Sequence, residues 1–276
     1  MSEEFKYAIL DTDFVSKANI IKANDRVLAD EVLEFPGYKF YCHQKMKEEL
    51  GDHGTRPSKA WLDDKIKSGA IQLYTDERII NELHKEIGDN CYIYYRSFLK
   101  DGCDMFDSGF YSEFFGDLDK WLENKSRSKD FLSVLRSCEA KIGHQRSYGE
   151  VKAYVLLRTI QFLYSGPVFI FCSDDQNARK GFANTAQIPC ISILSVFCKL
   201  KLLGKTIEET HGFYQSFTDW CLKRDNPQTT VKVWAFKEGS YKRARVPIEG
   251  ILKDIYADVY EVRKDGDLQR RQTMPC

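Results

Sequence analysis

Acidic residues that follow two apolar runs are the first candidates for chemistry in this sequence. A short apolar run near the start ends at Asp11, with Asp13 two residues further on, and the run Val168–Cys172 is followed by Asp174 and Asp175. Both runs are typical of buried strands. Because sites in open parallel sheets form beyond the carboxyl ends of strands, we expect these acids to lie at one sheet edge.

Another acid, Glu150, begins a long apolar stretch directly after Gly149. A carboxylate at a helix N-terminus is stabilised by the helix dipole, so Glu150 taken alone needs no other role. Three or four carboxylates that converge on one point are different, because their repulsion destabilises the fold unless a cation neutralises them. Oxygen ligands of high charge favour Mg²⁺ or Mn²⁺ over zinc. The pattern therefore indicates a divalent metal site.

The elements that would position these acids alternate between strand and helix. One long helical stretch is predicted over 12–34, and another over Tyr148–Leu163. Such alternation predicts an α/β fold, a parallel sheet sandwiched by helices. The predicted strands are 6–11, 38–42, 70–74, 168–172 and 188–193.

Two segments do not follow this alternation of strands and helices. Residues from about 88 to 146 mix aromatic and charged side chains without strand-like alternation, and we interpret them as a helical insertion. After about 225, alternating stretches at 229–236 and 255–262 and a basic stretch at 241–246 predict a small C-terminal β extension, with a polar tail from Lys264. The predicted domains are therefore 1–225, which contains the insertion, and 226–276.

Composition limits the class of protein. The formal net charge is zero, which argues against a general nucleic-acid coat protein but allows a local basic rim. The nine cysteines are odd in number and widely spaced, as expected for reduced thiols in a cytoplasmic protein rather than for zinc ligands. No apolar run approaches the roughly 20 residues that span a bilayer, and the start lacks a signal-peptide pattern, so we expect no membrane association.

Four segments in this order resemble the PIN-domain nucleases: Ile9–Phe14, Lys47–Leu50, Tyr148–Ala153 and Ser173–Arg179. The last two are most similar to a bacterial subgroup with a Gly-Glu helix start and an Asp-Asp-x-x-Ala-Arg segment. The resemblance covers about 1–90 and 147–205. It implies a PIN-like fold and leaves the insertion and the C-terminal extension unexplained.

The resemblance implies a metal-dependent endoribonuclease that cleaves single-stranded RNA with one or two Mg²⁺ or Mn²⁺ ions. Carried over by position, Asp11, Glu150 and Asp175 would be metal ligands, and Asp174 would assist. Glu49 would be the acid of the second motif. The metals would activate water and stabilise charge on the phosphate, while the carboxylates position the metals.

Other residues keep two interpretations. Glu48 competes with Glu49 for the second motif, and both could be solvated helix-face acids. The candidate substrate contacts have ordinary alternatives in helix capping, solvent exposure, a polar loop or an exposed basic strand. These candidates are Asp13, Asn177, Arg146, Lys242 and Arg243.

Two rival hypotheses remain open. In a haloacid-dehalogenase-type phosphatase, Asp11 would be the covalent nucleophile, with Lys152 and the later acids assisting. Against it, Phe14 stands where a small or hydroxyl residue is expected, and the run 38–42 ends without Ser or Thr. The second rival is a non-catalytic PIN-like binding or scaffold module.

The biological setting is open within the nuclease hypothesis. Small PIN nucleases resemble toxins of toxin–antitoxin pairs or defence effectors, which would imply an inhibitory protein partner. A homodimer is implied by the resemblance only.

Overall fold

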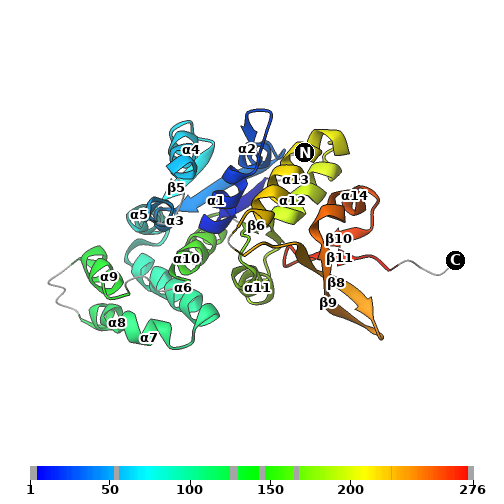
Figure 1. Ribbon diagram of the computed structural model, residues 1–276. Coiled ribbons are helices and arrows are strands. Elements are labelled where there is room, and N and C mark those ends of the chain that lie inside the picture. The colour runs from blue at the N-terminus through cyan, green and yellow to red at the C-terminus, as the bar shows by residue number, and fades with distance from the viewer. Residues whose placement is uncertain are drawn as a thin grey trace.

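Five parallel strands form the centre of the molecule in the order β5-β4-β1-β6-β7 (Figure 1). The computed structural model describes residues 5–52, 56–124, 130–142, 147–164, 168–224 and 226–272. The strands are β1 (Lys6–Leu10), β4 (Tyr38–His43), β5 (Ile71–Tyr74), β6 (Val168–Cys172) and β7 (Cys190–Ile191). The predicted α/β class and parallel sheet are confirmed.

Alternation along the strands gives the sheet two apolar faces. Ala8 and Leu10 contribute to one hydrophobic cluster, whereas Ile9 contributes to another. The first face is covered by α1 (Thr12–Ile20), α2 (Leu28–Leu33), α3 (Gln44–Asp52), α4 (Arg56–Lys67), α12 (Ile193–Leu202) and α13 (Ile207–Leu222). The second face is covered by α5 (Asp76–Ile87), α6 (Cys91–Phe106), α10 (Tyr148–Leu163) and α11 (Gln176–Asn184).

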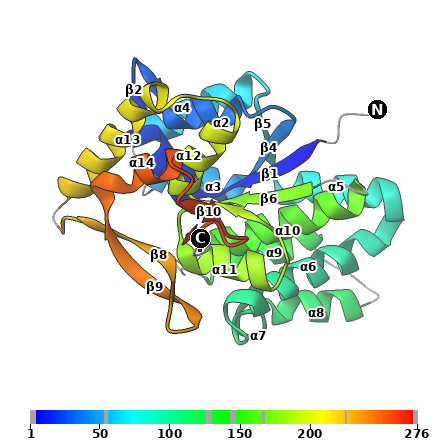
Figure 2. The same ribbon diagram turned by 90° about the vertical axis from the view of Figure 1, so that its right-hand side faces the viewer.

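In its described residues the predicted insertion consists of helices joined by turns, without a strand. It comprises η1 (Gly88–Asn90), α6, α7 (Phe110–Phe114), α8 (Gly116–Glu123) and α9 (Phe131–Glu139), which lie together beside α10 (Figure 2). Its aromatic side chains are mostly core: Tyr95, Phe115 and Phe131 are buried in the second hydrophobic cluster. They stabilise the insertion against the sheet rather than offering free stacking surfaces.

The C-terminal extension forms a second, mixed sheet in the order β10-β11-β8-β9. Its elements are β8 (Thr230–Lys237), β9 (Ser240–Pro247), η2 (Ile248–Gly250), α14 (Ile251–Tyr256), β10 (Tyr260–Val262) and β11 (Leu268–Arg270). Val233, Ile248 and Leu268 belong to the same hydrophobic cluster as the first face of the central sheet. The extension therefore shares a core with the α/β part.

The predicted continuous helix over 12–34 is wrong. A short hairpin of β2 (Lys22–Ala23) and β3 (Arg26–Val27) separates α1 from α2. Asn24 and Asp25 make its turn, both with positive φ, at 49° and 61°. Two consecutive left-handed residues of these types are typical of a tight hairpin turn, which the apolar spacing conceals.

Three further boundaries are corrected. The stretch 255–262 is not one strand, because Ile251, Leu252 and Ile255 are buried at helical spacing in α14. The polar tail from Lys264 contains β11 and the buried Asp267. The strand predicted at 188–193 shortens to β7, because the Ser192 side chain caps α12.

Candidate functional site

The order of the strands in the central sheet reverses beside β1. From β1 the chain moves outward to β4 and β5 on one side, and later returns to β6 and β7 on the other side. Such a reversal of strand order opens a crevice at the carboxyl ends of the two strands where it occurs. Asp11 directly follows β1, and Asp174 and Asp175 follow β6 after Ser173. The acids predicted from the sequence therefore lie at the reversal point.

Asp11 occupies the deepest position. It is only 6% exposed, and its Oδ2 accepts a 2.7 Å hydrogen bond from the Ser173 hydroxyl. Burial raises the pKa of Asp11 well above its ordinary value, and the negative charge of Glu150 raises it further. The Ser173 hydrogen bond acts in the opposite direction but does not offset these effects. Asp11 is thus a carboxylate in an environment that disfavours its charge.

Glu150 and Glu49 approach the same place from two helices. Glu150 lies in the first turn of α10, and burial together with the charge of Glu49 raises its pKa to about 7. Glu49 projects from α3 and accepts a 2.7 Å hydrogen bond from the Thr12 hydroxyl. A Cβ at Gly149 would lie 2.6 Å from both carboxylate oxygens of Glu49. Glycine at 149 therefore allows the Glu49 carboxylate to reach the start of α10.

A lysine links two of the remaining acids. The Lys17 ammonium lies 2.7 Å from Asp13 and 2.8 Å from Asp174. Burial raises the pKa of Asp13 in spite of Lys17, and the charges of Asp174 and Asp175 contribute. Burial alone would lower the pKa of Lys17, but Asp174 and Asp13 raise it. One cation is thus shared by two carboxylates.

Arg179 stabilises the loop that follows β6. The Asp175 side chain accepts a 2.8 Å hydrogen bond from the Ala178 amide and caps α11. The Arg179 guanidinium donates to the carbonyl oxygen of Ser173 at 3.1 Å and forms an ion pair with Asp267 at 2.8 Å. The C-terminal extension therefore helps to position the acidic loop. Asn177 is exposed in the first turn of α11.

We name Asp11, Asp13, Glu49, Glu150, Asp174 and Asp175 the carboxylate cluster. Its donors are all oxygen atoms with excess negative charge, which is the chemistry that Mg²⁺ and Mn²⁺ select. Among the residues that the structure describes, however, no three His, Cys, Asp or Glu side chains are arranged to hold one ion. Thr12, Lys17 and the backbone of α11 engage several of the oxygens. The donor chemistry fits such a metal, but coordination would require side chains to turn toward a common point.

The other predicted site residues do not belong to the carboxylate cluster. Glu48 forms a 3.6 Å ion pair with Lys45 and lines a different hollow, so Glu49 is the acid of α3 that faces Glu150. Arg243 is bonded to Asp267, whereas Lys242 pairs with Glu238 near the tip of the β8–β9 hairpin. Arg146 lies outside the described residues.

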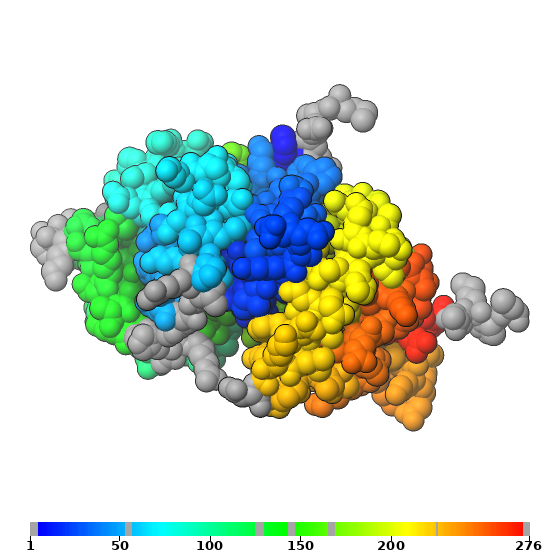
Figure 3. Space-filling view, turned by 45° about the horizontal axis from the view of Figure 1, so that its top comes forward, coloured from blue at the N-terminus to red at the C-terminus, as the bar shows by residue number. Residues whose placement is uncertain are grey.

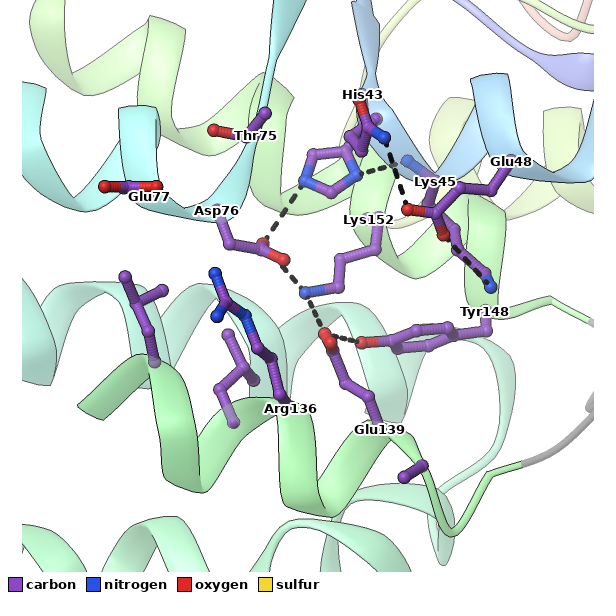
Figure 4. Close-up of a pocket in the computed structure, with 14 residues that line it drawn as sticks. His43, Lys45, Glu48, Thr75, Asp76, Glu77, Arg136, Glu139, Tyr148 and Lys152 are labelled. Carbon is purple, nitrogen blue, oxygen red and sulfur yellow. Dashed lines mark hydrogen bonds and ion pairs between the residues drawn. The ribbon is translucent and has the colours of Figure 1, made fainter. Parts of the chain in front are cut away.

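A second charged cluster at the same sheet edge was not predicted (Figure 4). The Lys152 ammonium, in a side chain only 1% exposed, lies 2.8 Å from Asp76 and 2.6 Å from Glu139. Tyr95 and His43 also bond to Asp76, and the Tyr148 hydroxyl donates to Glu139. We name these six residues the lysine cluster. They border a hollow of about 630 Å³, except for Tyr95, which is buried beneath it.

Two features of the sequence could have identified Lys17 and Lys152 as members of charged clusters. Lys17 follows Asp13 by four residues, the spacing at which opposite charges meet on a helix. Lys152 is a charged residue within a strongly apolar helical stretch, where a cation needs partners. The identity of those partners depends on the insertion, whose packing the sequence pattern does not determine.

Comparison of the chain with protein-family models, with curated proteins and with solved structures finds no match. None of the helices in the described ranges is both long and apolar enough to cross a membrane. The eight cysteines that the structure describes are all free and buried, in agreement with the expected reduced thiols.

Proposed function

We propose that this protein is a metal-dependent nuclease that cleaves phosphodiester bonds in single-stranded RNA. The observation that carries the proposal is the convergence of six acids from four parts of the chain beside the carboxyl ends of β1 and β6. Each of the four motifs that resemble PIN-domain nucleases contributes at least one acid to this cluster. A PIN-like fold is the finer description that we propose for the α/β part.

The electrostatics of the cluster favour the binding of a cation. The pKa values of Asp11, Asp13 and Glu150 are all raised by burial and by neighbouring acids. Raised pKa values in a group of neighbouring acids are typical of functional sites rather than of residues that stabilise the fold. A divalent cation would neutralise the carboxylates.

The chain's own residues have distinct roles in this proposal. Asp11, Glu150 and Asp175 would hold Mg²⁺ or Mn²⁺, with Asp174 assisting, and the metal would supply Lewis acidity and an activated water. Ser173 fixes the orientation of the Asp11 carboxylate. Lys17 places an ammonium at the rim, where it can meet a phosphate oxygen.

The test is cleavage of a labelled single-stranded RNA with Mn²⁺ or Mg²⁺, with EDTA as the negative control. We expect Asp11→Asn and Glu150→Gln each to lower the rate about a hundredfold or more. Asp101→Asn is the matched control, because Asp101 is an exposed acid of α6. Its rate should equal that of the wild type.

Turnover of a chromogenic phosphate monoester distinguishes the phosphatase alternative from the proposed nuclease. In that alternative Lys152 would assist the acids at β1, but its ammonium is engaged by Asp76 and Glu139 instead. Monoester turnover that fails with Asp11→Asn and survives Glu150→Gln would overturn the nuclease proposal. Binding of RNA with no cleavage under any metal condition would favour the non-catalytic module.

A further inference from the structure

A groove leads away from the carboxylate cluster toward the C-terminal hairpin. It has a volume of about 590 Å³ and lies between α13 and the strands β8 and β9. Asp174, a member of the carboxylate cluster, and Lys17, which pairs with it, both line this groove. In the space-filling view α13 lies between the N-terminal elements and the C-terminal extension (Figure 3). The groove and the candidate active site are thus continuous.

The groove carries a local excess of positive charge in a chain whose net charge is zero. Two carboxylates, Asp174 and Asp267, face six cations, an excess of four positive charges. The six cations are Lys17, Arg179, Arg224, Lys232, Arg243 and Arg245. A basic surface of this kind attracts a polyanion.

Three of the cations are anchored and three are not. Lys17 pairs with Asp13 and Asp174, and the buried Asp267 holds Arg179 and Arg243. The other three are exposed, and none lies within ion-pair distance of a described carboxylate. They are Arg224, Lys232 and Arg245.

Two of the unanchored cations oppose each other. Lys232 on β8 is in direct register with Arg245 on β9. Like charges opposite each other across an antiparallel pair destabilise the hairpin, so this pairing is unfavourable in the protein alone. A bound phosphate between them would convert the repulsion into attraction.

An aromatic ring accompanies the charges. Trp220, on the last turn of α13, also lines the groove, and the Arg224 guanidinium carbon lies 4.8 Å from the ring centroid. Trp220 is only partly buried. Cations that track a backbone, together with an aromatic side chain on which a base can stack, are typical of grooves that bind single strands.

We propose that this groove binds the single-stranded RNA that flanks the scissile phosphate. Arg224, Lys232 and Arg245 contact its phosphates, and Trp220 stacks on a base. Because Asp174 of the carboxylate cluster and its partner Lys17 also line the groove, a strand bound there lies next to that cluster. The assignment of RNA rests on the proposed function, but the binding itself requires no catalysis.

The experiment measures binding without cleavage. A fluorescein-labelled single-stranded RNA of about twelve nucleotides is titrated with the full chain in EDTA, and anisotropy is followed at several salt concentrations. We expect the triple variant Arg224→Gln/Lys232→Gln/Arg245→Gln to bind about tenfold or more weakly at low salt. The slope of log affinity against log salt should fall by about 2, since each phosphate contact on a single strand contributes about 0.7.

Two further variants sharpen the result. The control Lys85→Gln/Lys100→Gln/Lys253→Gln removes the same charge from exposed positions outside the groove and should bind like the wild type. Trp220→Leu should weaken binding about tenfold while leaving the salt slope unchanged, because stacking releases no counterions.

Three outcomes would overturn the groove assignment: unchanged binding by the triple variant, equal weakening by the control variant, or equally tight binding of an RNA duplex. Competition by polyglutamate as effective as RNA at equal charge would also overturn it in favour of an acidic polypeptide. RNA binding that depends on the groove without metal-dependent cleavage would support this assignment and remove the proposed function. Metal-dependent cleavage that is unaffected in the triple variant would support the proposed function and remove the groove assignment.

Discussion

Two charged clusters lie at the same edge of the sheet and show opposite electrostatics. Helix α10 contributes to both, because Glu150 and Lys152 are two residues apart and project in nearly opposite directions. In the carboxylate cluster, burial and neighbouring acids raise the pKa of Glu150. In the lysine cluster, burial alone would raise the pKa of Asp76, but Lys152 and His43 lower it far below its ordinary value.

The opposite pKa shifts in the two clusters distinguish acids that stabilise the fold from acids that do not. Asp76 accepts hydrogen bonds from Tyr95 and Lys152, and His43 is in contact with it, so its charge is compensated by groups of the chain itself. The charges of Asp11 and Glu150 are opposed by their surroundings. A compensated cluster is explained by structure alone, whereas an uncompensated one is the kind of site that the cation of the proposed function would stabilise.

The largest expected effect comes from removing the cation of the lysine cluster. Lys152→Met should lower the free energy of unfolding by about 3–5 kcal/mol, because the partly buried carboxylates of Asp76 and Glu139 would lose their shared cation. Urea denaturation at pH 7 measures the change. Lys85→Met, at an exposed position of α5, is the matched control and should change stability by less than about 0.5 kcal/mol. A loss below about 1 kcal/mol for Lys152→Met would show that the cluster is not a compensated unit.

Asp76→Asn tests the same cluster from the acidic side, with an expected loss of about 2–3 kcal/mol at pH 7. Because the pKa of Asp76 is lowered in the folded state, the unfolded state binds the proton more tightly. The stabilisation is therefore complete above the unfolded pKa of about 4 and is lost as the pH falls below it. Unfolding curves from pH 7 down to pH 3 should show the variant and the wild type converging. A difference that stays constant over this range would contradict the compensated charge.

Local patterns predicted one of the two clusters and missed the other. Asp11 and Asp174 follow apolar strands, and strand ends of a parallel sheet share one edge, so their proximity follows from alternation alone. Lys152 meets Glu139 only because α9 of the insertion packs near α10, and no periodicity of the sequence encodes that docking. The lysine cluster could be suspected from Lys152 but not assembled.

The missed elements have the same physical origin. The turn at Asn24 and Asp25 depends on backbone φ values that apolar spacing does not register. The strand β11 is short and flanked by charged residues, and it is fixed by pairing with β10 and β8. Long, strongly apolar segments such as α10 were predicted with their correct limits because burial on one or more faces dominates their sequence.

Glu150→Gln should have the opposite sign to both changes in the lysine cluster. Because the pKa of Glu150 is raised to about 7, the folded state holds the proton more tightly than the unfolded state. Stability therefore falls as the pH rises from about 4.5 to about 7, and the neutral glutamine removes this loss. We expect the variant to be more stable than the wild type by about 1–3 kcal/mol at pH 8 and equal to it at pH 4. Thermal unfolding in EDTA measures this, and a variant that is less stable at pH 8 would contradict the uncompensated charge.

The smallest expected effect on stability sharpens the geometry of the carboxylate cluster. In Gly149→Ala the new Cβ would meet the Glu49 carboxylate at 2.6 Å, but that group is the far end of a flexible side chain and can move. The helix propensity of alanine, worth about 1 kcal/mol, then offsets most of the strain, so the net change in stability should stay within about 1 kcal/mol. Metal-dependent RNA cleavage should nevertheless fall about tenfold, because Glu49 is displaced. The double variant Gly149→Ala/Glu49→Ala has no carboxylate to displace. It should therefore be more stable than the sum of the two single changes in unfolding free energy predicts. Strict additivity in this cycle would mean that Glu49 does not depend on the glycine, and the close approach of α3 to α10 would lose its role in building the site.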